Sequence, residues 1–476
     1  MKHTDIIQKL NLEQKCALLS GETVFTTRAL PGKGIPAITL SDGPNGVRKQ
    51  AGAADHLGLN PSVPATCFPT SSATACSWDE KLGEAVGEAL GEEAAAQEVA
   101  VLLGPGLNIQ RSPLCGRDFE YFSEDPILAG RMAAAYVRGI QKNGISACPK
   151  HFAVNSQELR RMASDSVLDE RTLRELYLTG FEIVVKEAKP KTIMTSYNLI
   201  NGTYANENAH LLQDILRKDW GFDGAVVTDW GGSNDHALGV KNGSTLEMPC
   251  PGGDSIRELM KAVQDGKISE ADVDARLDEM LELVLSTHAA VEKAPRTFDA
   301  AAHHKLARRA AAESIVLLKN EGGILPLKPN EKLAVIGDFA ETPRYQGAGS
   351  SAVNALQVDT LLDSIKADDS GITLVGYASG FERQGAADAE KLEEAVALAK
   401  KADTVLLCLG LDELRESEGL DRSDMKLAEN QQQLLAAVAA VNPNVVVLLS
   451  AGAPIETPWA GQCRALVYGA LGGQAG

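Results

Sequence analysis

The stretch GAVVTDW, residues 224–230, places an acidic side chain directly after a short apolar run. Residues 225–228 have the length of a strand, and a run that is apolar throughout is typical of a strand buried in a parallel sheet. Asp229, followed by the indole of Trp230, therefore stands where a buried strand emerges. On this run alone two interpretations of Asp229 remain open: a residue that caps a helix, or a carboxylate that acts in a site.

Runs of the same kind recur on both sides of this stretch and alternate with segments of helical spacing. Strand-like runs occupy residues 99–103, 192–196, 225–228 and 245–248, and helical stretches occupy residues 80–97, 173–186, 256–264 and 269–286. This alternation predicts parallel β/α units, which over about 280 residues form either a closed (β/α)8 barrel or a large open sheet.

The chain of 476 residues is too long for one core, since single cores stop growing at roughly 250–300 residues. The pattern weakens at residues 288–308 and then restarts, with strand-like runs at 333–337, 373–377, 404–410, 445–450 and 465–469 and helical stretches at 386–401 and 429–441. We predict a barrel in residues 1–287, a linker in 288–308 and a doubly wound α/β domain in 309–476. The chain stops just past a strand-like run, and we expect this second domain to be incomplete.

The composition excludes several classes of partner. The formal net charge of −18 disfavours a nucleic acid or an anionic membrane, whereas a neutral small molecule is not repelled. No stretch has the length of a membrane span, and the N-terminal residues lack the apolar run of a signal peptide. Eight scattered cysteines without a C-x-x-C pair predict free thiols in a reducing cytoplasm. A homo-oligomer is left open.

Polar residues that follow the apolar runs are the candidates for chemistry, because a (β/α)8 barrel carries its active site at the carboxyl ends of its strands. Each alone is weak evidence, since a Ser-Asp-Gly sequence is more often a turn than a site. Several at successive strand ends predict a site for a neutral polyol, whose hydroxyls they can share. They are Ser41 to Gly43, Asn108, Arg111, Arg117, Lys150, His151, Ser196 to Asn198, Asp229 and Trp230.

Metal, phosphate and acidic-loop signals were weighed against simpler interpretations. His303 and His304 lie in the predicted linker, where we expect solvated side chains, and His151 has no second histidine at helical spacing, so no metal is predicted. GAGSSA, residues 347–352, lacks the Gly-Lys-Ser/Thr ending of a phosphate loop and is at most the tip of a binding loop. Residues 412–424 form a carboxylate-rich loop after a strand; composition favours a solvated loop, but a glycosidase needs a second carboxylate besides Asp229.

Long motifs in the same order show that the chain resembles the β-glucosidases of glycoside hydrolase family 3. The motifs are SDGPNGVR (41–48), GPGLNIQRSPLCGRDFEYFSEDP (104–126), KHFAVN (150–155), DERTLRELYLTGFE (169–182), MTSYNLING (194–202), VVTDWGG (226–232), SIVLLKNEGGILPL (314–327), YQGAGSS (345–351) and ESEGLDR (416–422). The resemblance implies a TIM-like barrel followed by an α/β sandwich, with the active site in the cleft between them.

The resemblance also implies the roles of individual residues. Asp229 is expected to be the nucleophile of a retaining mechanism, and Glu418 the acid/base, with a pKa raised by its surroundings and a carboxyl group about 5–5.5 Å from that of Asp229. Only the family pattern separates Glu418 from Glu416. The expected sugar contacts are Asp42, Arg117, Lys150, His151, Tyr197 and Trp230. No metal or organic cofactor is implied.

Three other functions remain open beside the exo-acting β-glucosidase: a β-xylosidase, a β-N-acetylglucosaminidase and a non-catalytic sugar-binding fragment. The second of these typically has a K-H-F-P-G-H-G loop, whereas KHFAVN lacks its second histidine. The family's L-D-L-E-M-P-G becomes STLEMPC at residues 244–250, so we expect Thr245 and Cys250 to change a loop near the barrel mouth. Family members continue past GGQAG into the rest of the sandwich and commonly a fibronectin-III-like domain.

Overall fold

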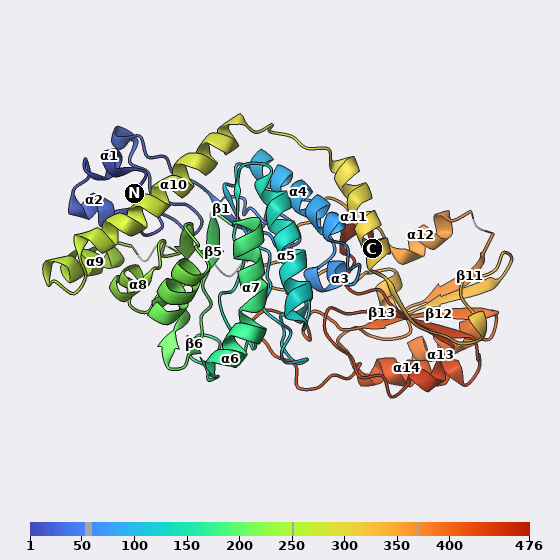
Figure 1. Cartoon of the computed structure of the whole chain (residues 1–476). Helices are drawn as coiled ribbons and strands as arrows, with labels where there is room; N and C mark the ends of the chain where they lie inside the picture. Colours follow the sequence, from blue (N-terminus) through green and yellow to red (C-terminus); the bar gives the residue numbers. More distant parts are fainter. Residues whose placement is uncertain (53–59, 250–251, 370) are drawn as a thin grey trace.

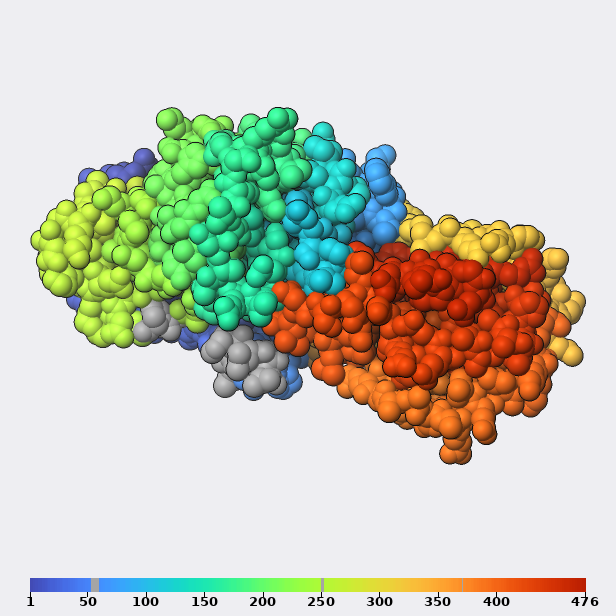
Figure 2. All heavy atoms as spheres, turned by 90° about the horizontal axis from the view of Figure 1, so that it is seen from below, coloured from blue at the N-terminus to red at the C-terminus, as the bar shows by residue number. Residues whose placement is uncertain are grey.

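The computed structural model describes residues 1–52, 60–249, 252–369 and 371–476. Two bodies lie side by side, a helix-covered barrel built from the first part of the chain and an α/β sandwich built from the last part (Figure 1). The space-filling view shows the same two bodies meeting along one face, with the chain end in the sandwich (Figure 2). The predicted fold class, a TIM-like barrel followed by an α/β sandwich, is confirmed.

Short parallel strands form the wall of the barrel. Leu40 pairs with Val101, Val101 with Ser146, and Thr192 with Ala225. Apart from the final Asp42, the side chains of these strands are buried, as expected for strands covered by helices on the outside. The strands are β1 (Leu40–Asp42), β2 (Val101–Leu103), β3 (Ser146–Ala147), β5 (Thr192–Met194) and β8 (Ala225–Val227).

Single bridges close this wall into a ring. Phe152 pairs with Thr195 between the segment after β3 and the segment after β5. Leu246 then pairs with Val227 beside β8, and Glu247 pairs with Ser20, both in parallel. The predicted strand at 245–248 is therefore present as a bridging segment rather than a full strand.

Helices cover the outside of the barrel. Helices α4 and α5 approach closely because a Cβ at Gly87 or at Gly139 would overlap the backbone of the other helix. The predicted helix at 173–186 is interrupted, since π-helical turns flank α7 on both sides. The covering helices are α2 (Leu12–Ala17), α4 (Glu80–Ala96), α5 (Pro126–Gln141), α7 (Thr179–Ile183), α8 (His236–Asn242), α9 (Asp254–Gln264) and α10 (Glu270–Lys293).

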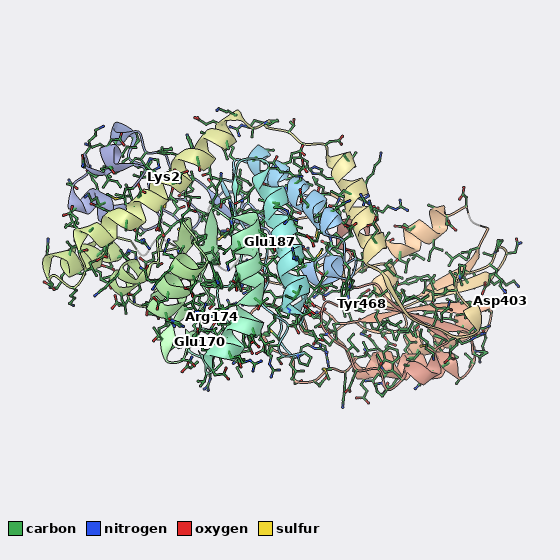
Figure 3. The ribbon with its side chains drawn as sticks, in the orientation of Figure 1. Lys2, Glu170, Arg174, Glu187, Asp403 and Tyr468 are labelled. Carbon is green, nitrogen blue, oxygen red and sulfur yellow. The ribbon has the colours of Figure 1, made fainter. Side chains whose placement is uncertain are left out.

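Charged side chains dominate the outer surface of the barrel. Glu170 and Arg174 form one i,i+4 ion pair there, with a nitrogen to oxygen distance of 2.7 Å, and both are labelled on the lower surface in Figure 3. Within the described ranges, no helix is both long and apolar enough to cross a membrane. Seven cysteines are free thiols, and Cys250 lies outside the described residues.

The sandwich is a six-stranded sheet in the order β11-β10-β12-β13-β14-β9, parallel except for β9 at one edge. Helix α12 lies on the opposite face from α13 and α14, as expected for a doubly wound sheet (Figure 1). All five predicted strands are present, whereas the antiparallel β9 was not predicted. The elements are β9 (Val316–Asn320), β10 (Lys332–Ile336), β11 (Thr373–Ala378), β12 (Thr404–Gly410), β13 (Val445–Ser450), β14 (Ala465–Tyr468), α12 (Leu361–Ala367), α13 (Ala389–Ala399) and α14 (Glu429–Ala439).

The region predicted as a linker, residues 288–308, is mostly helical. It contains the end of α10 and the start of α11 (Ala300–Ser314), so residues 294–299 alone lie between the two helices. Ala307 and Ala310 of α11 belong to the hydrophobic core of the barrel. The apolar face of α11 therefore packs on the first body, and the division of the chain at 287 and 309 stays a prediction.

The expectation that His303 and His304 are solvated is wrong, because α11 turns both toward its neighbours. His303 is 6% exposed, and its Nδ1 lies 2.7 Å from Glu93 Oε1 on α4. The Phe298 ring stacks on His303 with a centroid distance of 5.4 Å. His304 lies 2.9 Å from Asp359 Oδ2 and accepts a hydrogen bond from Gln474. Together they tie α11 to α4 and to the chain end.

We expect His303→Gln to lower the thermal midpoint of unfolding more at pH 5.5 than at pH 8.5. Burial lowers the pKa of His303, but the carboxylates of Glu93 and Glu92 outweigh it, and the folded-state pKa is raised. A raised pKa stabilises the fold fully below the unfolded-state pKa of about 6.5, and this stabilisation is lost as the pH rises through the folded-state pKa. Calorimetry at the two pH values measures it.

The matched control is His288→Gln on α10, whose imidazole is more exposed and pairs with Glu292 on the same helix at 3.3 Å. It should change the midpoint little at either pH, since an exposed pair contributes little. An equal loss for His303→Gln at both pH values would show that its charge does not stabilise the fold.

Candidate active site

A cavity of about 400 Å³ lies between the strand ends of the barrel and two loops of the sandwich. All eight residues that the sequence singled out as catalytic or sugar-binding line it. They come from segments as far apart as Asp42 and Glu418. The lining residues are Phe25, Asp42, Arg117, Lys150, His151, Arg161, Met162, Met194, Tyr197, Asp229, Trp230, Gly231, Pro249, Ser350 and Glu418.

Asp229 follows β8 by one residue and points into the cavity wall. It does not cap a helix, because α8 is capped by Asp235, and so the helix-cap interpretation fails. Asp229 Oδ1 accepts a hydrogen bond of 2.8 Å from the Trp230 amide. Its Oδ2 lies 3.6 Å from His151 Nε2 and, among the described residues, accepts no hydrogen bond. This second oxygen is therefore the one placed to react.

Burial raises the pKa of Asp229, and the cations of Arg117, Arg161 and Lys150 oppose that rise. Burial likewise raises the pKa of Asp42 to about 6, with Lys150 as the main opposing charge. The cations are thus the groups that keep both carboxyls acidic inside a buried cavity.

Glu120 holds two of these cations in place, although sequence reasoning did not single it out. Its Oε2 lies 2.7 Å from Arg117 Nη2, and its Oε1 lies 3.3 Å from Lys150 Nζ. Lys150 Nζ is also 4.0 Å from Asp42 Oδ1. Burial alone lowers the pKa of Lys150, but Glu120 and Asp42 outweigh it and raise the pKa. Lys150 therefore stays protonated. The signal for Glu120 was its place in the motif GRDFE.

His151 is a neutral imidazole. Burial, with Arg117 and Lys150 nearby, lowers its pKa well below the ordinary value. Arg117 Nη2 lies 3.2 Å from His151 Nε2, and because a guanidinium only donates, Nε2 is the acceptor and the proton sits on Nδ1, 3.2 Å from Tyr121 Oη. Asn108 bonds both the amide and the carbonyl of His151, at 2.7 and 2.8 Å. Asn108 thus orients His151 rather than lining the cavity.

Aromatic side chains form one wall. The Trp230 indole donates to the Val24 carbonyl at 2.7 Å and packs against Phe25 with a ring distance of 5.3 Å. Tyr197 Oη donates to the Trp230 carbonyl at 2.9 Å, and the Arg161 guanidinium lies 4.9 Å from the centre of the Tyr197 ring. An apolar wall beside carboxylates and cations suits the two-sided surface of a sugar ring.

Glu418 reaches the cavity from the loop of residues 411–424, which follows β12. Its Oε1 accepts a hydrogen bond of 2.8 Å from Arg161 Nη1 and lies 3.6 Å from Arg117 Nη1. Its Oε2 accepts a hydrogen bond of 2.8 Å from the Ser350 amide. The expectation of a raised pKa is wrong for this unliganded cavity: burial raises the pKa of Glu418, but Arg117, Arg161 and Ser350 outweigh it and lower the pKa.

Glu416, the competing glutamate, does not line the cavity. Its Oε1 accepts a hydrogen bond of 2.7 Å from the Gly452 amide inside the sandwich, and burial raises its pKa to about 7. The 411–424 loop is therefore not a solvated acidic loop, since Glu416 is 1% exposed. GAGSSA also lies at the cavity, because Ser350 lines it, as a binding-loop tip should.

Other sequence candidates lie elsewhere. Arg111 lines a separate hollow of about 660 Å³ outside the cavity. Thr245 does not change the barrel mouth: it is buried, and its hydroxyl bonds the Val226 amide and Glu279. Cys250 is outside the described residues. Arg161 was missed because it follows no strand, standing ten residues after His151 in a loop.

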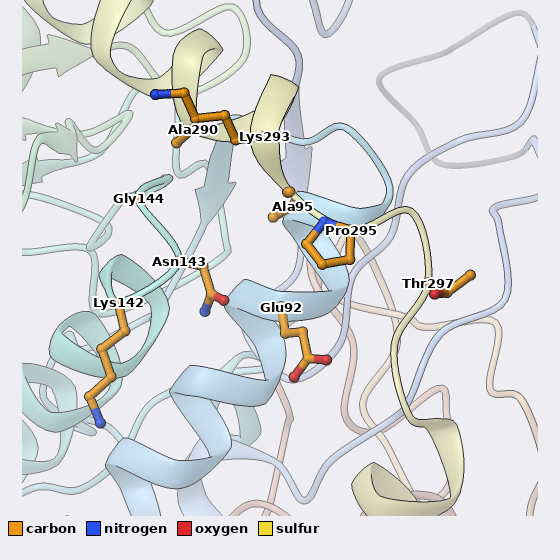
Figure 4. A pocket seen from close by; sticks show the side chains of 10 residues that line it. Glu92, Ala95, Lys142, Asn143, Gly144, Ala290, Lys293, Pro295 and Thr297 are labelled. Carbon is orange, nitrogen blue, oxygen red and sulfur yellow. The ribbon is translucent and has the colours of Figure 1, made fainter.

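A further hollow of about 370 Å³ lies at the other side of the barrel, between the ends of α4, α5 and α10 (Figure 4). Glu92, Lys142, Asn143 and Lys293 line it, with one carboxylate against two lysines. Within the ranges that the structure describes, no group of three His, Cys, Asp or Glu side chains could hold a metal ion.

Fold and cavity together define a two-body α/β protein whose site joins barrel strand ends to a sandwich loop. Residues 48–283 match the model of the glycosyl hydrolase family 3 N-terminal domain, and residues 315–476 match that of the family 3 C-terminal domain. The chain belongs to glycosyl hydrolase family 3.

Among similar proteins, a thermostable beta-glucosidase B from Acetivibrio thermocellus is 46% identical over 474 residues. An exo-alpha-(1->6)-L-arabinopyranosidase from Bifidobacterium longum is 44% identical over 482 residues. Each alignment covers 99% of this chain, which spans 62% and 63% of the length of these relatives. The crystal structure of a family 3 beta-glucosidase from Bifidobacterium adolescentis superposes with a TM-score of 0.93 at 43% identity, covering 99% of this chain and 67% of that one.

Proposed function

We propose that this protein is a retaining, exo-acting β-glucosidase that releases terminal non-reducing β-D-glucose from β-glucosides and oligosaccharides. One observation carries the proposal: a single cavity brings Asp229 of the barrel and Glu418 of the sandwich together among Asp42, Arg117, Lys150, His151, Tyr197 and Trp230. Two carboxyl groups facing one sugar site are the minimum for this chemistry. Similarity to proteins named beta-glucosidase supports the choice of sugar.

Asp229 is the proposed nucleophile. Its unbonded Oδ2 attacks the anomeric carbon while Asp42, Arg117, Lys150 and His151 hold the hydroxyls of the glucose by hydrogen bonds, several of them charge-assisted. The covalent glycosyl-enzyme is then resolved by water. Attack and hydrolysis both occur at the same face of the sugar, and two inversions give net retention.

Glu418 is the proposed acid/base, and its lowered pKa defines what substrate binding must accomplish. In the empty cavity Glu418 is a carboxylate, the form needed for the base of the second step. For the first step we propose that sugar hydroxyls take over hydrogen bonds of Arg161 and exclude water, which raises the pKa of Glu418. Once Asp229 becomes an ester its negative charge disappears, so the pKa of Glu418 falls again and the base form returns.

An α-L-arabinopyranosidase is the second candidate, because a relative with that name is nearly as similar as the first. β-Xylosidase is a third, since xylose is glucose without its hydroxymethyl group. A panel of aryl β-glucoside, β-xyloside, α-L-arabinopyranoside and N-acetyl-β-glucosaminide separates them by kcat/KM. A sugar-binding protein without turnover would cleave none of the four.

The cytoplasm is the proposed location. The seven described cysteines are all free and six are buried, and unpaired buried thiols fit a reducing compartment. The net charge of −18 argues against nucleic acid or an anionic membrane as a partner and leaves a neutral glycoside as the expected one.

The first product should be β-glucose. With retention, NMR spectra taken within minutes of adding enzyme to a β-glucoside show the β-anomer before mutarotation produces the α-anomer. Initial α-glucose would contradict the proposed double displacement and the separation of about 5–5.5 Å expected between the Asp229 and Glu418 carboxyls.

Asp229→Ala should lower kcat by about 10⁴-fold or more, because the group that forms the covalent bond is gone. Glucose binding should persist, since Asp42, Lys150 and His151 still hold the hydroxyls. Calorimetric titration with glucose measures binding, and a chromogenic glucoside measures turnover.

The same role is checked by labelling the wild-type enzyme with a 2-deoxy-2-fluoro glucoside and mapping the peptides. The label should lie on Asp229. A label on any other carboxylate would remove Asp229 from the nucleophile role.

Glu418→Ala should lose most activity on cellobiose, whose leaving sugar needs a proton, by about 10²–10⁴-fold. It should still form the glycosyl-enzyme rapidly from a dinitrophenyl glucoside, whose leaving group needs no acid. Azide, which needs no general base, should then accelerate turnover and yield β-glucosyl azide.

Glu416→Ala is the matched variant from the same loop, and it should show neither leaving-group dependence nor azide rescue. If the rescue appears in Glu416→Ala and not in Glu418→Ala, the acid/base is the other glutamate.

A further inference from the structure

The inference concerns how Glu418, a side chain of the sandwich, is fixed over a site that belongs to the barrel. It rests on the proposed function, since it deepens the role of the 411–424 loop. The observations are contacts between this loop and two barrel loops, one leading into Arg117 and the other into Arg161.

Asp421 makes the most concentrated contact across the boundary. Its Oδ1 accepts hydrogen bonds from the Gly116 amide at 3.2 Å and the Glu158 amide at 3.0 Å. Its Oδ2 accepts from the Glu158 amide at 3.0 Å and the Leu159 amide at 2.8 Å. One carboxylate of the sandwich thus binds three backbone amides of the barrel, and bonds of this charged kind are among the stronger ones.

Glu158 returns the contact in the opposite direction. This barrel side chain is 3% exposed, and its Oε2 accepts a hydrogen bond of 2.8 Å from the Gly419 amide, directly after Glu418. The same oxygen lies 2.7 Å from Arg161 Nη1, which also bonds Glu418 Oε1. Glu158 therefore holds both the backbone beside Glu418 and the cation that contacts its carboxylate.

The backbones approach too closely for any side chain to intervene. A Cβ at Gly116 would overlap the carbonyl oxygens of Ser417 and Leu420. On the other side of the loop, a Cβ at Gly349 would overlap Glu418 Cβ, and the Glu418 amide donates to the Ala348 carbonyl at 3.0 Å. Glu418 is thus held between a barrel loop and the 347–351 loop.

We infer that Asp421 and Glu158 form a reciprocal clasp whose role is to position Glu418 at the glycosidic oxygen. Neither residue lines the cavity, so both act through Glu418 and are positioning residues. The clasp places the two loops that carry Arg117 and Arg161 against the loop that carries Glu418. A displacement of about 1 Å at such a group can cost about 10²-fold in rate.

The first test uses Asp421→Asn, which keeps the volume but places an amide NH2 against backbone N–H groups. We expect kcat/KM for cellobiose to fall by about 10²-fold, and that for a dinitrophenyl glucoside to fall less than about tenfold, because only the former needs a placed acid. Glu158→Gln should show the same asymmetry to a smaller extent, since its amide oxygen can still accept from Gly419.

The matched control is Asp424→Asn in the same loop, whose carboxylate bonds Arg415 and the Lys426 amide within the sandwich. It should leave the ratio of the two kcat/KM values unchanged. Equal losses on both glucosides in Asp421→Asn and Glu158→Gln would overturn the inference, since that is the result of a merely structural role.

Hydrogen exchange monitored by mass spectrometry tests the clasp without using activity. Asp421→Asn should speed exchange in the peptides containing Gly116 and residues 158–159, and Asp424→Asn should not. Unchanged exchange in Asp421→Asn overturns the clasp. If the wild-type enzyme hydrolyses neither glucoside, the proposed function fails and this measurement still decides the clasp.

Discussion

The buried carboxylate of Glu120, held between Arg117 and Lys150, sets the charge arrangement that the rest of the cavity follows. Lys150 would lose its proton on burial without a negative partner, and Arg117 would be an uncompensated buried charge. Because Glu120 binds both, two cations stand side by side at strand ends, where like charges otherwise repel. They in turn lower the pKa values of Asp42 and Asp229 and contribute to the neutral state of His151. The polarity of the site is thus decided one layer below the residues that face the sugar.

Most of the barrel and all eight of the proposed site residues could be predicted because their signals are local. An apolar run followed by a polar residue, as in residues 225–230, reports both the strand and the place where its end opens. The residues that escaped prediction depend on contacts between distant segments. Arg161 follows no strand, Glu120 touches no sugar-facing space, and β9 pairs with β14, almost 150 positions away, in the opposite direction to the other strands. His303 was wrong for the same reason, since its partners Glu92 and Glu93 are some 210 residues away.

The pKa of Glu418 could not be predicted from its motif either, because it depends on three groups from three segments. Burial by itself favours the protonated acid, and a family pattern carries that expectation with it. Arg117, Arg161 and the Ser350 amide reverse the direction in the empty cavity. The geometry of the loop is conserved in the motif, but its electrostatics emerge from the barrel that it meets.

This reversal bears on why the two carboxyls come from different bodies. Asp229 sits on a strand end fixed by the barrel core, where burial raises its pKa, whereas Glu418 sits on a loop whose pKa is lowered by barrel arginines. Arg161 Nη1 is shared between Glu158 and Glu418, so its hold on Glu418 can weaken without leaving the guanidinium unpaired. A ligand that draws Arg161 toward Glu158 shifts the Glu418 pKa upward, and departure of the ligand restores it. The boundary between the bodies therefore supplies an adjustable charge contact, which a site built wholly within the rigid barrel would lack.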